Sequence, residues 1–338
     1  MKIEEHIPLS RFTTFAIGGP ARFFVQVKTT DELEEALKFW KEKNMPLFIL
    51  GGGSNLLISD AGFPGLVIKI EIEGIEEKKI DAHTSLLIGG AGVNWDEFVA
   101  YAVDQGLHGI ENLSLIPGTL GAAPVQNIGA YGVEAKDTLA WVEAIDSTTG
   151  ELVTLRNSEC AFAYRDSIFK KQKQYVITRV ALRLSRNGAL HTEYKDIKRY
   201  FDEHSEIRPT LENVRNAVIE IRTNKLPDVN KIGTAGSFFK NPIITKEHYK
   251  KLLLSWSLMP SYEVDGEHVK IPLAWVLDNV CGFRGVVRGN VGVYKNQALV
   301  LVNNGAGTSS EVRALAEEMR KSVLEKTGIE IEREVEYV

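Results

Sequence analysis

Residues 47–55 read LFILGGGSN, a short apolar run followed by three glycines and two polar residues. Four apolar residues, typical of a short buried strand, run directly into three consecutive glycines. Because glycine has no side chain, such a loop lets the backbone approach an anion closely and point several N–H groups at it. Ser54 and Asn55 add side-chain donors. The stretch therefore predicts an anion-binding loop at the end of a strand, with an ordinary flexible turn as the alternative.

This loop does not fit the common phosphate-binding or hydrolase motifs. Leu56 stands where the dinucleotide fingerprint G-x-G-x-x-G needs its third glycine, and no Gly-Lys-Ser/Thr follows as in a P-loop. The same leucine breaks the G-x-S-x-G elbow of α/β-hydrolases. The seven histidines show neither H-E-x-x-H spacing nor pairing with cysteine, so we expect no metal site.

Strand and helix patterns alternate on both sides of the loop. Apolar and β-rich runs predict strands at 21–28, 46–50, 66–70, 85–89, 141–147, 151–155 and 175–184. Apolar residues spaced three and four apart predict helices at 30–44, 94–106, 211–224, 245–256 and 308–328. The composition changes near residue 208. We therefore expect an α+β chain with a nucleotide-type domain over 1–207 and a smaller domain over 208–338.

Length and charge narrow the class of protein further. A chain of 338 residues has room for about two domains, and its 44% hydrophobic and 25% charged residues exclude global disorder. A net charge of −5 argues against a general nucleic-acid or anionic-membrane partner. Two cysteines are too few for a disulfide scaffold, and the first residues lack the apolar run of a signal peptide. We expect a soluble cytoplasmic protein.

A second glycine-rich segment, IPGTLGAAPVQNIGAYG, covers residues 116–132. Small residues dominate it, and its polar side chains are mostly amides rather than charged groups. Such a segment suits close packing against a flat ligand, with backbone groups making the hydrogen bonds. A solvated loop, which is the alternative, would carry more Asp, Ser and Lys. The composition favours ligand contact.

Two later motifs place Arg or Lys beside aromatic residues. They read YRDSIFK at 164–170 and GSFFKNP at 236–242, the second preceded by RTNK at 222–225. This pattern is expected where a carboxylate or phosphate is held in a partly dry site, although surface ion pairing is the ordinary alternative. Near the C-terminus, EIEREV at 330–335 has the composition of an exposed strand with alternating charge.

Taken together and in this order, the motifs resemble the UDP-N-acetylenolpyruvoylglucosamine reductase (MurB) family in its larger, type I form. The resemblance runs from residue 13 to residue 334 and departs at Arg333, where many members have proline. It implies a two-subdomain FAD-binding domain of the vanillyl-alcohol-oxidase/PCMH type, divided near residue 65. A smaller α+β substrate-binding domain follows, with the C-terminal segment returning to the active site.

The resemblance also implies an activity. Members use NADPH and FAD to reduce the enolpyruvyl group of UDP-N-acetylenolpyruvoylglucosamine to UDP-N-acetylmuramate, in peptidoglycan precursor synthesis. The flavin is expected to be noncovalent, because neither glycine-rich segment contains His or Cys. We expect a monomer whose partners are small molecules, with no nucleic acid or membrane. A flavin oxidase on the same fold and a UDP-sugar-binding protein without redox activity are the alternatives.

Family roles carry over to individual positions. Arg165 and Glu334 are implied to stabilise an enolate-like intermediate, and Ser237 to donate a proton to its C2 atom. An ionised Glu334 would oppose the enolate, so we expect it protonated or acting through a hydrogen bond. The implied FAD contacts are Gly51, Gly53, Ser54, Asn55, Pro117, Gly118, Gly121, Ala122, Asn127, Gly129 and Arg222. The implied UDP-sugar contacts are Tyr194, Lys225, Asn241 and Tyr262.

Overall fold

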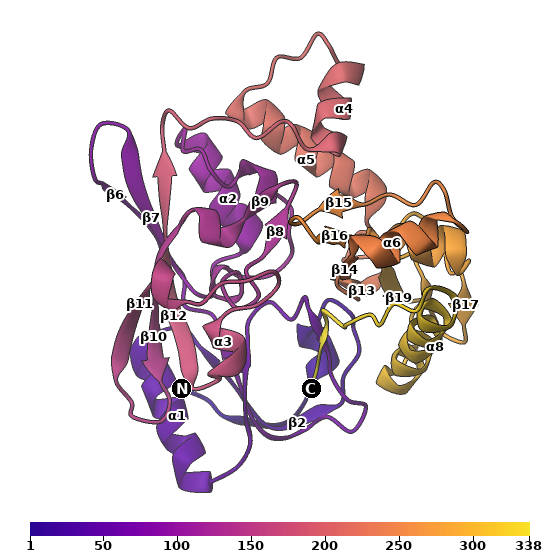
Figure 1. Cartoon of the computed structure of the whole chain (residues 1–338). Helices are drawn as coiled ribbons and strands as arrows, with labels where there is room; N and C mark the ends of the chain where they lie inside the picture. The colour runs from indigo at the N-terminus through magenta and orange to yellow at the C-terminus, as the bar shows by residue number, and fades with distance from the viewer. The chain divides into compact units, whose positions relative to one another are not determined.

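The computed structural model describes all 338 residues (Figure 1). Their contacts group them into two units. Unit 1 comprises Met1–Ile7, Ala21–Gly52 and Pro64–Asn224, and unit 2 comprises Pro8–Pro20, Gly53–Phe63 and Lys225–Val338. None of the helices has the length and apolarity needed to cross a bilayer. Each unit is built around its own cluster of buried apolar side chains.

The first sheet of unit 1 contains the strand that leads into the glycine loop. Its order is β1(Glu4–Pro8), β2(Pro20–Val27), β5(Phe63–Ile70), β3(Leu47–Leu50), and β3 runs parallel to β5. Helix α1(Thr30–Lys43) begins where the Thr29 side chain accepts a hydrogen bond from the Glu32 amide, and ends at left-handed Asn44. Its buried face, with Leu33 and Leu37, joins the same core cluster as the sheet. The predicted strands and helix here are confirmed.

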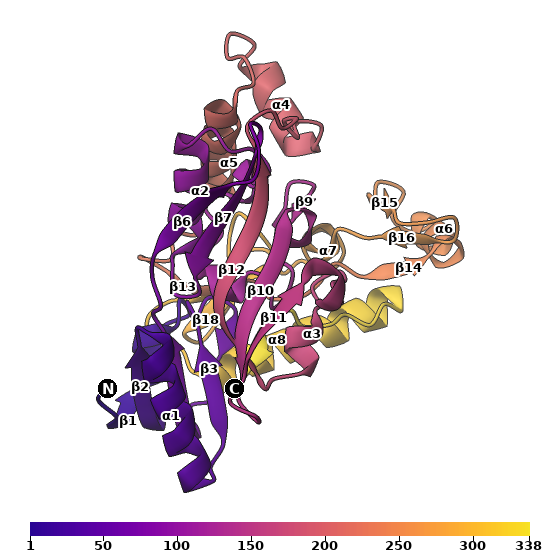
Figure 2. The same ribbon diagram turned by 90° about the vertical axis from the view of Figure 1, so that its left-hand side faces the viewer.

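The second sheet of unit 1 has five strands with antiparallel neighbours (Figure 2). Its order is β11(Leu152–Arg156), β10(Leu139–Asp146), β12(Tyr175–Ser185), β7(Thr84–Gly90), β6(Ile75–Lys79). The connection between β10 and β11 turns at Gly150, whose φ of +85° favours glycine. The remaining elements of unit 1 are α2(Trp95–Asp104), β8(Gly129–Ala130), β9(Val133–Glu134), α3(Ile168–Lys171), α4(Lys195–Glu203) and α5(Leu211–Lys225), with 3-10 turns at Glu111–Leu113, Leu120–Ala122, Ala135–Asp137 and Asn157–Glu159.

Unit 2 is built on a four-stranded sheet, ordered β13(Gly233–Ser237), β19(Val300–Asn303), β18(Val291–Val293), β17(Val287–Arg288). Helix α8(Ser309–Thr327) packs against β18 and confirms the helix predicted at 308–328. A reciprocal capping box of Thr308 and Glu311 starts it, and left-handed Gly328 ends it. The remaining elements are β14(Ile243–Thr245), β16(His268–Lys270) and β15(Tyr262–Glu263) in a small sheet, β20(Glu336–Tyr337) parallel to β4(Leu56–Leu57), the helices α6(Lys246–Leu253) and α7(Leu273–Trp275), a π-helical turn at Val276–Val280 and a 3-10 turn at Leu9–Phe12.

The division of contacts differs from the predicted domain boundary at residues 207/208. Unit 1 continues through α4 and most of α5, and unit 2 takes in two early segments of the chain. The backbone explains this, since Thr14 donates to the Gly53 carbonyl and accepts from the Thr234 amide, both within unit 2. The predicted subdomain division near residue 65 falls inside β5, and the first sheet continues to Ile70.

Two further predictions need correction. The helix predicted at 245–256 is shorter in the structure, where α6 covers only Lys246–Leu253. The exposed strand predicted at 330–335 is wrong: Ile331 and Val335 are buried in the core of unit 2, and only Arg333 makes a single bridge, with Phe239. The alternating charges suggest an exposed strand, whereas the buried Ile331 and Val335 anchor the segment in the core.

Candidate active site

In unit 1 the two glycine-rich segments lie against each other. A Cβ added at Gly51 would lie 2.8 Å from Thr119 Oγ1, and one added at Gly52 would lie 2.6 Å from the Gly118 Cα. Both positions therefore need glycine for this close approach. The Thr119 hydroxyl is buried and has no hydrogen-bond partner within the protein. A cradle without side chains that contains an unpartnered buried hydroxyl fits a cofactor phosphate or ring edge.

Backbone hydrogen bonds fix the second segment to the turn after β7. The amides of Leu120 and Gly121 donate to the carbonyls of Val93 and Ala91, and the Trp95 amide donates to the Gly118 carbonyl. A Cβ at Gly121 would lie 2.5 Å from that of Ala91. Pro117 and Ala122 flank these anchored residues, so the predicted second wall of the cofactor site is a rigid backbone surface.

The Asn127 side chain is buried and forms its hydrogen bonds within the protein. It is fully buried, and its Nδ2 donates to Glu134 and to the Ala163 carbonyl at 3.0 and 3.2 Å. Its Oδ1 accepts from the Lys136 amide at 3.0 Å. These bonds tie the second glycine-rich segment to the start of the YRDSIFK motif. A direct FAD contact by Asn127 stays a prediction, and its amide already has three protein partners.

Arg165 is held by the same segment. One of its Nη atoms donates to the Gly129 carbonyl at 3.0 Å, and its guanidinium lies 5.4 Å from the Tyr164 ring. A Cβ at Gly129 would lie 3.3 Å from the other Nη, so glycine leaves room for the guanidinium. Arg165 has a φ of +54°, and Ser167 anchors the turn by donating to the Val125 carbonyl at 2.6 Å. A non-glycine residue held at positive φ is typical of a functional position.

Two arginines of α5 contact the first turn of α2 and the loop beyond α2. Arg215 makes a two-pronged bond to Asp96 at 2.7 and 3.0 Å, and Asp96 also accepts from the Leu115 amide. The Nε of Arg222 donates to the Leu115 carbonyl at 3.3 Å. Burial acts to raise the pKa of Asp96, but Arg215 and the Leu115 amide outweigh it and hold that pKa below its ordinary value.

Tyr131 connects a predicted cofactor contact with a predicted substrate contact. Burial raises the pKa of its phenol, and the neighbouring Arg222 opposes that rise. Burial likewise lowers the pKa of Arg222, opposed by Tyr131 and Asp96. The Tyr131 ring meets the Tyr194 ring edge-on at 5.5 Å. Tyr131 is not among the site residues expected from the sequence. As the lone aromatic residue in a segment of small residues, it could have been identified as a candidate.

Ser237, in unit 2, lies at the end of β13 beyond an irregularity in strand pairing. Thr234 pairs with Val302 whereas Ser237 pairs with Val300, so the register shifts between them. The Thr234 hydroxyl stabilises the shift: it accepts from the Gly236 amide at 3.1 Å and donates to the Leu301 carbonyl at 2.8 Å. Such bulges commonly redirect a side chain beside an active site.

Glu334 and Asn55 meet next to Ser237. The Glu334 amide donates to the carbonyl of Phe238 at 2.9 Å, and the Asn55 side chain donates to the Glu334 carbonyl at 3.1 Å. The Glu336 amide in turn donates to the Asn55 carbonyl. Three predicted site residues from distant parts of the sequence are thus brought together within unit 2.

The other predicted residues of unit 2 lie at separate places. Gly53, with a φ of +64°, precedes Ser54 and abuts the Phe12 carbonyl. Asn241 accepts from the Leu273 amide at 2.9 Å, at the start of α7. Tyr262 is exposed on β15, opposite Lys270, and Lys225 is the last residue of α5.

Comparisons with known proteins agree with this arrangement. Residues 21–156 match a family model described as an FAD binding domain, and residues 227–338 match one described as the C-terminal domain of UDP-N-acetylenolpyruvoylglucosamine reductase. The reductase of that name from Flavobacterium johnsoniae is 43% identical, with 100% of both chains covered. The one from Chromobacterium violaceum is 42% identical, covering 99% of this chain and 98% of the relative.

A solved structure supports the fold independently. The crystal structure of UDP-N-acetylenolpyruvylglucosamine reductase (MurB) from Thermus caldophilus is similar with a TM-score of 0.70 and 24% sequence identity. The match covers 100% of this chain and 99% of the other. The fold class predicted from the sequence, an FAD-binding domain followed by a smaller α+β domain, is confirmed.

Proposed function

Because the chain belongs to the UDP-N-acetylenolpyruvoylglucosamine reductase family, we propose that Arg165, Ser237 and Glu334 carry out its chemistry. The chain is an FAD-dependent, NADPH-driven oxidoreductase, a UDP-N-acetylmuramate dehydrogenase of peptidoglycan precursor synthesis. Its partners are small molecules: the UDP-sugar enolpyruvyl ether and NADPH. We propose that the protein is a monomer. We also propose that it acts in the cytoplasm, where both of these small molecules are available.

The observation that carries the cofactor assignment is the cradle formed by Gly51, Gly52, Gly118 and Thr119. Its glycines leave space at backbone level, and the buried Thr119 hydroxyl has no partner in the protein. FAD, when bound, accepts hydride equivalents from NADPH and supplies them to the enolpyruvyl double bond. The residues we propose to hold it are Gly51, Gly53, Ser54, Asn55, Pro117, Gly118, Gly121, Ala122, Gly129 and Arg222, with Asn127 supporting the loop from behind.

Arg165 suits the substrate carboxylate. Its guanidinium is permanently charged and planar, so it can hold a carboxylate in a fixed orientation and stabilise the negative charge that spreads onto it. The bond to the Gly129 carbonyl and the Tyr164 ring hold it in one orientation, which reduces the cost of binding.

Ser237 is the proposed proton donor to C2. A serine hydroxyl is a weak acid, but a carbanion-like acceptor in a dry site is a strong enough base to take its proton. The bulge before Ser237 gives the hydroxyl a direction that regular strand pairing would not. Glu334, fixed beside it through the Phe238 carbonyl, acts protonated or through a hydrogen bond, because an additional negative charge would oppose the enolate.

The UDP-sugar contacts combine charge with aromatic surface. Lys225 suits the diphosphate as a point charge, and Tyr194, Asn241 and Tyr262 offer rings and an amide for the sugar and base. Tyr131 joins this set as the residue that supports Tyr194.

Replacement of Ser237 by alanine tests the assignment. The hydroxyl acts only on the enolpyruvyl group, so NADPH should still bleach the flavin at an unchanged rate. Reoxidation by the UDP-sugar should slow by roughly 10²–10⁴-fold, as expected for a lost general acid, and Ser237→Cys should recover part of the rate. Stopped-flow absorbance measures the two half-reactions separately. Equal slowing of both, or of neither, contradicts the role given to Ser237.

A further inference from the structure

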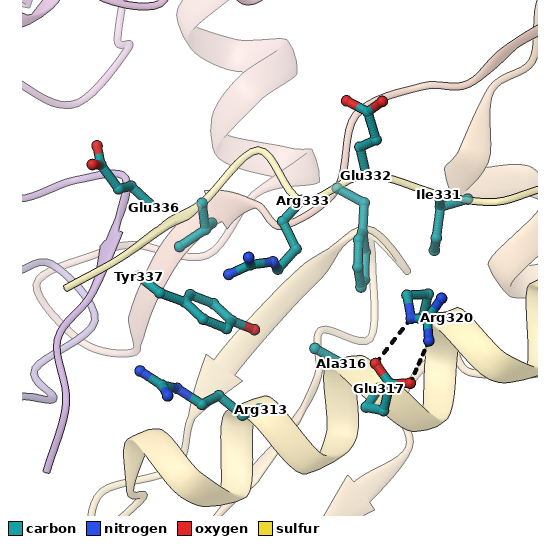
Figure 3. Close-up of a pocket in the computed structure, with 11 residues that line it drawn as sticks. Arg313, Ala316, Glu317, Arg320, Ile331, Glu332, Arg333, Glu336 and Tyr337 are labelled. Atoms are coloured by element: carbon teal, nitrogen blue, oxygen red, sulfur yellow. Dashed lines mark hydrogen bonds and ion pairs between the residues drawn. The ribbon is translucent and has the colours of Figure 1, made fainter. Parts of the chain in front are cut away.

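Tyr337 lies at the centre of a cluster at the C-terminus. The Arg333 guanidinium lies 3.7 Å from its ring centre and that of Arg313 lies 4.7 Å away, both within the range of about 6 Å for cation–π contact. Figure 3 shows the two guanidiniums on either side of the ring, one from the C-terminal segment and one from α8. The cluster forms part of the wall of a pocket of about 830 Å³ within unit 2.

The same ring contacts the neighbours of two proposed catalytic residues. Arg333 precedes Glu334 in the chain, and Phe238, whose ring lies 6.2 Å from that of Tyr337, follows Ser237. The Phe238 carbonyl accepts the hydrogen bond from the Glu334 amide. Tyr337 therefore contacts Arg333, next to Glu334, and Phe238, next to Ser237.

The backbone around Tyr337 is fixed as well. Strand β20 pairs in parallel with β4, which directly follows Asn55. The carbonyl of Val338 accepts from the Ser59 amide at 2.7 Å, so the last residue is anchored too. The chain beyond Glu334 thus forms a short return strand. The Tyr337 side chain connects this strand to α8 and to Phe238, directly after β13.

We propose that Tyr337, clamped between Arg333 and Arg313, is a positioning residue that holds Glu334 and Ser237 in their working arrangement. This rests on the catalytic roles proposed above. The main contribution is that of the aromatic ring, because both guanidiniums and Phe238 meet it. The Arg333 side chain also hydrogen-bonds with the hydroxyl. Burial raises the pKa of this phenol, so the side chain stays neutral at ordinary pH.

The test compares Tyr337→Ala with Tyr337→Phe, which keeps the ring. Arg333→Ala removes an exposed partner without disturbing the core. Arg320→Ala is the matched control: this arginine also lies on α8 and lines the same pocket, but it pairs with Glu317 instead of Tyr337. Each protein is measured by backbone hydrogen exchange at residues 334 and 336, by flavin absorbance, and by stopped flow in both half-reactions.

For Tyr337→Ala we expect exchange at these amides to accelerate roughly tenfold or more, since the return strand opens locally. Reoxidation by the UDP-sugar should slow about 10–100-fold through misplacement of the catalytic groups, with reduction by NADPH unchanged. Arg333→Ala should show the same pattern more weakly, and it stands in for Tyr337→Ala should that variant not fold. Arg320→Ala should match the unaltered protein. Tyr337→Phe keeps the ring and loses only the hydroxyl contact with Arg333, so its effect should be smaller than that of Arg333→Ala.

The proposal is overturned if Tyr337→Ala and Arg333→Ala leave exchange unchanged, or if Arg320→Ala has as large an effect as Arg333→Ala. Equal slowing of both half-reactions also overturns it, because that indicates general destabilisation. Failure of the catalytic assignment looks different: Ser237→Ala would then leave reoxidation unaffected while the exchange effect of Tyr337→Ala persisted.

Discussion

A positive side chain beside a diphosphate acts on bound substrate and on transition state alike. Lys225 is the proposed residue of this kind, and interactions that are equal in both states change KM rather than kcat. We expect Lys225→Ala to raise KM for the UDP-sugar by an amount corresponding to about 1.5–3 kcal/mol, the usual contribution of a charge-assisted bond. Steady-state kinetics checks this, with Lys231→Ala, on an exposed lysine, as control. A large fall in kcat at constant KM would place Lys225 in the chemistry instead.

For single residues, the sequence identified site candidates wherever the chemistry of the site allows only one residue type. Glycines without room for a side chain, and an arginine beside a tyrosine, could be selected as candidates from their type and neighbours. Asn127 could not be assigned in detail, because its three hydrogen bonds are made with Glu134, Lys136 and Ala163, which the fold brings together around it. Tyr131 was missed for the same reason, since its importance comes from Arg222 and Tyr194.

At the scale of elements, the approach of two loops determines the cofactor cradle. An added methyl group at Gly52 would meet the backbone of Gly118, which cannot move aside as a flexible side chain could. We expect Gly52→Ala to push the segments apart and to lower the FAD content of the purified protein. The absorbance ratio of flavin to protein measures this. Gly266→Ala, at an open position without positive φ, should retain full FAD; an equal loss there would contradict the argument.

The ion pair between Asp96 of α2 and Arg215 of α5 should make the free energy of unfolding depend on pH. Because the folded-state pKa of Asp96 is lowered, its ionised form stabilises the fold above the unfolded value of about 3.9. That contribution is lost as pH falls through the lowered folded-state pKa. We expect Asp96→Asn to reduce the free energy of unfolding by about 1.5–3 kcal/mol at pH 7.

Urea unfolding at pH 7 and near pH 3 checks this expectation, and the difference from the unaltered protein should shrink at the lower pH. Glu247→Gln removes an exposed pair with Lys251 and should change little at either pH. A difference for Asp96→Asn that persists unchanged at low pH would mean that the carboxylate charge is not its source.

Elements with local signals were predictable. The capping residues of α1 and α8 and the glycine that ends α8 are encoded in a few adjacent residues. The segment at 330–335 was not predictable, because its irregular path is set by the Phe238 carbonyl and by Asn55, both distant in the sequence. Composition cannot distinguish a strand from an extended segment held by such contacts.

At the scale of the whole molecule, unit 2 is assembled from three separate stretches of chain. A change in composition marks a point along the sequence, and so it could indicate one boundary but not the return of Pro8–Pro20 and Gly53–Phe63 to the later residues. The glycine loop crosses this division between Gly52 and Gly53.

Transfer of electrons from NADPH to an enolpyruvyl ether can be followed directly on the bound flavin. The purified protein is reduced with NADPH without oxygen, and UDP-N-acetylenolpyruvoylglucosamine is then added in measured portions. We expect the yellow flavin spectrum to return in proportion to the substrate added, with one UDP-N-acetylmuramate formed per flavin reoxidised. A spectrum that stays bleached until oxygen enters would indicate a flavin oxidase and contradict electron transfer to the enolpyruvyl ether.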